Sequence, residues 1–158
     1  MTDNEKILSY INKGVESEVV DFKQIFYSSL KDSNIAKHVA AFANNSINED
    51  KYIIFGVTDK TREICGIDPE SIPDIAHIEN YLSEKIEPYI SISVSCLKID
   101  EKEIAYLKIK KENLDRPYVI KNDCGMKNTI QRGDVYIRKG TYNSKALRTD
   151  LDKIYENN

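Results

Sequence analysis

Residues 16–24, ESEVVDFKQ, contain the carboxylates Glu16, Glu18 and Asp21, followed by Lys23. Carboxylates grouped beside a lysine can hold a divalent cation and stabilise charge on a phosphate. Apolar residues alternate with Asp21 and Lys23, which is the period of a half-buried strand, so the same pattern is typical of a solvated strand face carrying a salt bridge. Taken alone, the segment leaves both interpretations open.

Charge is divided unevenly along the chain. Residues 1–107 carry 11 Lys and Arg against 19 Asp and Glu, whereas residues 108–148 carry 11 against 4. A metal-using nuclease needs carboxylates for the cation and basic side chains for phosphates, although solvated faces can cluster in the same way. The candidates for nucleic-acid contact in the basic part are Arg132, Tyr136, Arg138, Lys139, Lys145 and Arg148.

Strand alternation sets the orientation of two of these candidates. Tyr136 and Arg138 share one face of a predicted strand, and Val135 and Ile137 share the other. We expect the charged face to be exposed, so that arginine grips phosphates and tyrosine stacks on unpaired bases. Tyrosines on a strand also serve as packing residues, and this alternative stays open.

Helices and strands alternate along the sequence. Apolar spacing, caps and breakers predict four helices. The first is near 4–13, capped by Asp3 and ended by Gly14, and the second starts at about 35, capped by Asp32, Ser33 or Asn34. The third covers 73–86, and the last follows Thr149, which forms a capping box with Asp152. Strands are predicted at 20–23, 52–57, 89–99, 103–111, 116–122 and 133–140, with a hairpin turn at 100–102. This order predicts an α+β single-domain sandwich with a mixed, largely antiparallel β-sheet and flanking helices.

Length and composition narrow the class of protein. The 158 residues suit one domain, 1–158, and 41% apolar with 31% charged residues is ordinary globular composition. No stretch approaches the roughly 20 apolar residues of a membrane span, and no signal peptide starts the chain, so we expect a cytoplasmic protein without a membrane partner. His38 and His77 lie in predicted helices without an evident partner, and neither they nor the three cysteines suggest a zinc site.

Four short motifs occur in a distinctive order: E-x4-D-F-K from Glu16, A-F-A-N, G-V-x-D and I-x-G-I. In this the chain resembles the Schlafen family, specifically the AlbA-like domain of type 2 (AlbA_2) that forms the lobes of the Schlafen core. The resemblance is strongest over 16–67 and resumes in the basic strand and last helix, 132–156.

The resemblance implies a three-carboxylate site. Schlafen nucleases cut RNA, notably tRNA, with a divalent cation held by residues that match Glu16, Asp21 and Asp59 here, and the family lysine matches Lys23. The expected cofactor is Mg²⁺ or Mn²⁺, not zinc, since all the ligands are oxygens. Glu18 is the alternative ligand to Glu16. For Lys23, a role on the phosphate and a salt bridge to Asp21 both remain open.

Two features differ from the family pattern. Asp21 stands where the nucleases often have Glu, and the glycine-rich turn before the central strand is replaced by NNSINEDKY. Glu16 and Asp21 also have opposite parity on a strand, so the chain must bend near Ser17 or Glu18 to bring them together.

The leading hypothesis is therefore a metal-dependent endoribonuclease acting on tRNA-like structured RNA. The first alternative is a non-catalytic DNA- or RNA-binding module of the kind found in bacterial regulators, and the second is a protein-interaction domain. Because one lobe needs a second copy to enclose a stem, we expect a homodimer.

Overall fold

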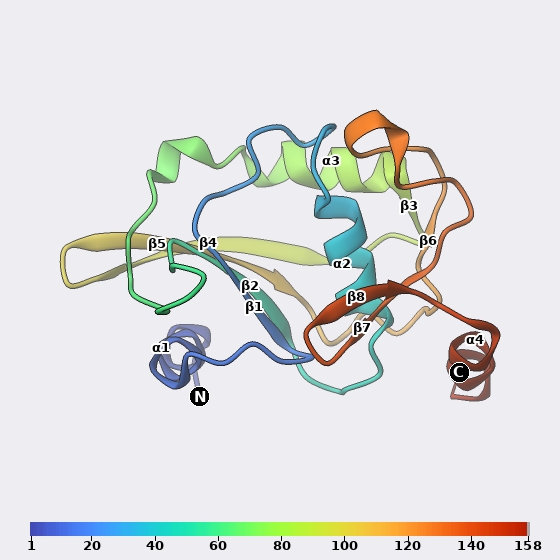
Figure 1. Ribbon diagram of the computed structural model, residues 1–158, viewed down its shortest axis with the longest axis horizontal. Coiled ribbons are helices and arrows are strands. Elements are labelled where there is room, and N and C mark those ends of the chain that lie inside the picture. The colour runs from blue at the N-terminus through green and yellow to red at the C-terminus, as the bar shows by residue number, and fades with distance from the viewer. Residues whose placement is uncertain (158) are drawn as a thin grey trace.

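The main sheet has four strands and combines parallel with antiparallel pairing (Figure 1). In the computed structural model, which describes residues 1–157, their spatial order is β1 (Val20–Lys23), β2 (Lys51–Phe55), β5 (Lys102–Ile109) and β4 (Ile92–Ile99). The β1–β2 pair is parallel, and the other two pairs are antiparallel. The predicted α+β class with a mixed, largely antiparallel sheet is confirmed. Asn158, the last residue of the predicted domain, lies outside the described residues.

Helices pack on both faces of this sheet. The four α-helices are α1 (Asp3–Lys13), α2 (Ile35–Asn44), α3 (Ile75–Lys85) and α4 (Arg148–Glu156). One hydrophobic core contains Ile7 and Ile11 of α1, and a larger core contains α2 and α3 on the other side of the sheet. No helix within residues 1–157 has both the length and the apolar character needed to cross a membrane.

Helix ends follow the predicted signals with small shifts. Gly14 ends α1 in the left-handed conformation, with φ +63°, as expected for a glycine after a helix. Its N-cap is Thr2, whose hydroxyl accepts from the Glu5 amide at 3.2 Å, and not Asp3. The predicted capping box of α4 is also wrong. This helix begins two residues earlier, at Arg148, so Asp150 accepts from the Leu147 amide at 2.8 Å.

Helix α2 connects the two parallel strands, since such strands cannot be joined by a tight turn. Eight of its ten residues are buried. Its small alanines allow close packing against the sheet, as predicted. The hairpin of β7 (Tyr136–Lys139) and β8 (Tyr142–Lys145) packs on another side of α2 (Figure 1). The carboxyl ends of β1 and β2 and the amino end of α2 therefore meet at one edge of the sheet.

Short elements complete the fold. They are the 3-10 helices η1 (Pro69–Ser71) and η2 (Met126–Asn128) and the two-stranded sheet of β3 (Ile86–Glu87) and β6 (Val119–Ile120). The predicted hairpin of β4 and β5 is confirmed, and its turn uses Asp100 and Glu101 at φ +48° and +69°. Strand β8 was not predicted, because its YNSK sequence lacks apolar alternation.

The expected exposure of the charged face of β7 is wrong. Tyr136 and Arg138 are only 3% and 2% exposed, while Val135 and Ile137 are partly exposed. The strand turns its Tyr136 and Arg138 face toward α2, where the Arg138 guanidinium lies 4.8 Å from the centroid of the Phe42 ring. Packing against α2 thus overrides the usual preference for burying valine and isoleucine.

Candidate functional site

A tight turn brings Glu16 back beside β1. The Ser17 amide donates to the Val20 carbonyl at 3.0 Å, and the Glu16 Oε2 atom accepts from the Phe22 amide at 3.0 Å. The predicted bend is therefore present. It places the Glu16 carboxyl within hydrogen-bonding reach of Asp21, although the two residues have opposite parity in sequence.

The two carboxyl groups titrate in opposite directions. Burial raises the pKa of Glu16, and its hydrogen bond to Asp21 adds to the increase. Burial also acts to raise the pKa of Asp21, but the hydrogen bond from Glu16 and the charges of Lys23 and Arg138 outweigh it, so this pKa is lowered. When the pair holds a single proton, that proton therefore resides on Glu16.

Each carboxylate oxygen of the pair already faces a donor of the protein. Asp21 Oδ1 lies 3.6 Å from Arg138 Nη2, and Asp21 Oδ2 lies 3.4 Å from Lys23 Nζ. Glu16 Oε1 lies 3.5 Å from Arg62 Nη2, and its Oε2 accepts from the Phe22 amide. Among residues 1–157, no three His, Cys, Asp or Glu side chains are grouped so as to hold a metal ion. As arranged here, these side chains do not fit a resident divalent cation.

Glu18 points to other partners. Its carboxylate accepts from the Gly140 amide at 3.1 Å and from the Asn45 side chain at 3.3 Å. These contacts tie the turn before β1 to the β7–β8 hairpin and to the end of α2. The structure thus gives Glu18 a structural role rather than that of a substitute for Glu16.

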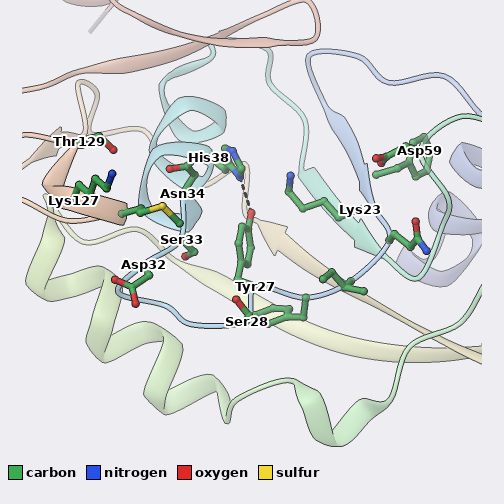
Figure 2. Close-up of a pocket in the computed structure, with 15 residues that line it drawn as sticks. Lys23, Tyr27, Ser28, Asp32, Ser33, Asn34, His38, Asp59, Lys127 and Thr129 are labelled. Carbon is green, nitrogen blue, oxygen red and sulfur yellow. Dashed lines mark hydrogen bonds between the residues drawn. The ribbon is translucent and has the colours of Figure 1, made fainter.

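Asp59 lies on the loop after β2, at the rim of an open pocket of about 680 Å³. Figure 2 shows Lys23 and Asp59 on one side of this pocket, Lys127 and Thr129 on the other, and Tyr27 and His38 between them. The pocket lies where β1 and β2 end and α2 begins. The structure therefore brings Asp59 to the same pocket as Lys23, but not into one group with Glu16 and Asp21.

Tyr27 and His38 form a hydrogen-bonded pair inside this pocket, with 2.7 Å between the Tyr27 hydroxyl and His38 Nδ1 (Figure 2). Burial lowers the pKa of His38 to about 3, so its imidazole is neutral near pH 7. Burial raises the pKa of Tyr27, so its hydroxyl keeps its proton. The expectation that His38 has no partner is therefore wrong. No local pattern relates two side chains eleven positions apart in a loop and a helix.

Arg138 is a buried structural hub. Its guanidinium donates to the Ser17 carbonyl at 3.1 Å, to the Asn143 side chain at 3.2 Å and to the Val20 carbonyl at 3.4 Å, and it faces Asp21. It therefore joins the C-terminal hairpin to the turn that carries the carboxylate pair. A side chain with 1% exposure cannot reach a phosphate outside the protein.

The family model for the Schlafen AlbA_2 domain matches residues 16–147. The chain belongs to the Schlafen AlbA_2 family. This membership associates the chain with nucleic acids at the level of the family.

A curated relative is the uncharacterized ATP-binding protein UU034 of Ureaplasma parvum, 27% identical over 157 residues. The alignment covers 88% of this AlbA_2 chain but only 42% of that relative, so the chain spans less than half of the relative's length.

Two solved structures share the fold. The DIP2311 protein from Corynebacterium diphtheriae has a TM-score of 0.58 at 16% identity, covering 98% of this chain and 32% of that one. The N-terminal domain of a RecG-related protein from Nitrosomonas europaea, named after ATP-dependent DNA helicases, has a TM-score of 0.52 at 17% identity, covering 93% of this chain and 95% of that one. At these identities the likeness concerns the fold alone.

The remaining basic candidates of the AlbA_2 domain are exposed. Side-chain exposure is 45% for Lys139, 59% for Lys145 and 92% for Arg148, and Arg132 is also exposed. Each of the first three has an acidic neighbour within 4 Å, at Asp150, Asp134 and Asp152 respectively. Surface pairs of this kind are weak and screened by salt, so they leave the cations able to bind phosphates. Tyr136, by contrast, is buried and donates to Asp134 at 2.9 Å.

Proposed function

We propose that this AlbA_2 domain binds nucleic acid without cutting it, with structured RNA of the tRNA type as its main partner. The observation that carries the proposal is the exposed outer side of the β7–β8 hairpin. Tyr142, 74% exposed, lies directly across the hairpin from Lys139 and on the same face, while the exposed Lys145 lies on the other face of β8. An exposed aromatic ring beside a cation suits an unpaired base and its neighbouring phosphate.

The ion pairing around Asp21 supports binding rather than cleavage. Three protein cations, Lys23, Arg62 and Arg138, face the Glu16–Asp21 pair. A carboxylate pair that is neutralised in this way stabilises the turn before β1 and needs no metal. Because a single domain of this size covers only one side of a stem, a homodimer remains part of the proposal.

The exposed cations provide the test. Removing three charges with Lys139→Gln, Lys145→Gln and Arg148→Gln is expected to weaken binding of purified tRNA at least tenfold at low salt. Each lost phosphate contact should also reduce the slope of log affinity against log salt by roughly 0.7–0.9. The affinity and its salt dependence are measured by fluorescence anisotropy at salt concentrations from about 50 to about 200 mM.

A matched control removes three exposed lysines from other surfaces: Lys13→Gln, Lys98→Gln and Lys111→Gln. The net charge change is the same, so long-range attraction falls equally in both triple variants. If the control weakens binding as much as the triple variant at Lys139, Lys145 and Arg148 does, these three cations do not form the contact surface. If the wild type shows no salt-dependent retention on RNA or DNA, the protein is not a nucleic-acid-binding domain.

A metal-dependent endoribonuclease is the second candidate. The observation that favours it is the turn at residues 17–20, which brings Glu16 beside Asp21, whose Oδ2 atom lies 3.4 Å from Lys23 Nζ. Against it stands the separation of Asp59 from this pair, because three grouped ligands are absent from residues 1–157.

A cleavage assay separates the two candidates. Purified tRNA is incubated with wild type or Asp59→Asn in Mn²⁺, Mg²⁺ or EDTA. We expect binding by both proteins and no cleavage by either. Cleavage that needs the metal and disappears in Asp59→Asn would instead establish the nuclease and reject the binding module. Because Asp59 is exposed, its replacement is not expected to disturb folding.

A further inference from the structure

The pocket beside Tyr27 has the size and lining of a small-molecule site. Its volume of about 680 Å³ falls within the range of ligand pockets in proteins. Three separate parts of the chain line it: the segment from the end of β1 to the first turns of α2, the loop after β2, and η2 with the residue that follows it. We propose that it holds one unstacked nucleotide of the bound RNA strand, an inference that rests on the proposed function.

Apolar side chains at the rim favour a flat, weakly hydrated group. Ile25 is 68% exposed and Met126 is 61% exposed, and both line the pocket. Large apolar side chains exposed around a concave surface are typical of a binding site. An unstacked base has two apolar faces, so it covers Ile25 and Met126 while lying against the Tyr27 ring.

Tyr27 is held in place before any ligand arrives. Besides the hydrogen bond to His38, its ring makes edge contacts with Phe26 and Phe55, at centroid distances of 5.4 Å and 5.9 Å. A fixed aromatic ring loses little conformational entropy on binding, which favours stacking. Because the pKa of His38 is about 3, its imidazole stays neutral around pH 7 and the hydrogen bond to Tyr27 is kept.

Two lysines provide the contacts for a phosphate. The Lys23 side chain is 26% exposed, with its Nζ 5.7 Å from the centroid of the Tyr27 ring. Lys127 is exposed on η2, where it and Asn128 adopt left-handed φ values of +55° and +52°. Such a conformation in a lysine is strained by about 1 kcal/mol or more, and strain of this kind is common where a side chain must be presented to a ligand.

The charge of the pocket selects the kind of nucleotide. Its lining contains two lysines, Lys23 and Lys127, and two aspartates, Asp32 and Asp59, while His38 is neutral. These four charges cancel, so the pocket has no excess positive charge to balance a triphosphate, whereas a phosphodiester with one negative charge needs a single lysine. The aspartates can accept hydrogen bonds from ribose hydroxyls or base amino groups. The pocket thus fits a nucleotide within a strand better than free ATP.

The test compares an RNA hairpin that has an unpaired loop with a fully paired RNA duplex. The variants are Lys127→Gly, which removes the cation at a φ that glycine adopts without strain, and Ile25→Asp, which adds a negative charge at an exposed position. Each is expected to weaken hairpin binding about tenfold and to leave duplex binding unchanged, because a duplex offers no unstacked base. Thermal unfolding should show that neither variant has lost its fold.

Lys98→Gln, an exposed lysine on β4, is the matched control for lost charge. Free AMP and ATP are added as competitors, and ATP is expected to displace the hairpin no better than AMP. If the wild type binds RNA and both pocket variants bind the hairpin like Lys98→Gln, the pocket inference is wrong while the proposed function stands. Displacement by ATP at far lower concentration than by AMP would also overturn it in favour of a free nucleotide. Failure of the wild type to bind either RNA rejects the proposed function itself.

Discussion

Arg138→Met is expected to lower the free energy of unfolding by about 3–5 kcal/mol, because it removes the buried guanidinium that faces the Oδ1 atom of the buried Asp21 carboxylate. The Ser17 and Val20 carbonyls lose their donor as well, and methionine has nothing to offer them. For a domain of this size, such a loss lowers the melting temperature by roughly 6–20 °C. Thermal and urea unfolding, followed by circular dichroism, measure it.

A double variant shows whether the buried charge is the cause. Asp21→Asn in the Arg138→Met background removes the carboxylate that has lost its arginine partner and is expected to recover part of the lost stability. The adjacent exposed Lys139→Gln is the control, and it should change the free energy of unfolding by less than about 1 kcal/mol. A loss below about 1 kcal/mol in Arg138→Met would show that Arg138 is not a structural hub.

Comparing Arg138→Met with Lys139→Gln also separates effects on folding from effects on nucleic-acid binding. Because Arg138 is buried, its replacement weakens nucleic-acid binding only by disturbing the fold. Lys139→Gln, in contrast, is expected to weaken binding while the protein stays folded. Measuring stability beside affinity therefore separates the structural arginine from the lysine that follows it.

Asn44→Asp is expected to lower the free energy of unfolding at pH 7 by about 3 kcal/mol or more. Asn44 is fully buried at the end of α2, and its amide donates to the carbonyls of Tyr118 at 3.0 Å and Tyr136 at 2.8 Å. Its side-chain oxygen accepts from the Tyr118 amide at 2.7 Å. An ionised carboxylate loses both donors and places negative charge beside two carbonyl oxygens, without access to water.

The loss should depend on pH in a defined direction. Burial beside carbonyls raises the pKa of the introduced carboxyl group, and a protonated carboxyl can again donate to one of them. The variant is therefore expected to be less impaired at pH 5 than at pH 7, since its folded state binds the proton more tightly than its unfolded state. Urea unfolding at both pH values measures this, with the exposed Asn48→Asp as control. An equal loss at both values would mean that burial of charge is not the reason.

Local features of the chain were predictable because neighbouring residues determine them. Gly14 ends α1, alanine-rich spacing forms the slim helix α2, and alternation across 92–109 forms the β4–β5 hairpin. The bend before β1 was also predictable, because opposite parity allows Glu16 and Asp21 to meet in no other way. The order of the motifs from Glu16 to Ile67 was enough to suggest the family.

Which face of β7 is exposed was not predictable, because the apolar character of its residues indicates the wrong face. Val135 and Ile137 are the more apolar pair, yet Tyr136 and Arg138 face the interior. An arginine can be buried here only because the Ser17 carbonyl, more than 100 positions earlier in the chain, accepts its hydrogen bond. Nothing near Arg138 in the sequence indicates that this partner exists.

The sequence by itself determined where helices and strands lie, the α+β class and the family, since these depend on local spacing and short motifs. Only the tertiary structure decided which charges are neutralised and where a pocket opens. Asp21 and Lys23 face each other as strand parity predicts, but the approach of Arg138 depends on the packing of β7 on α2. The pocket likewise requires Lys127 to meet the β1–α2 loop, and long-range contacts of this kind follow from the packed chain as a whole.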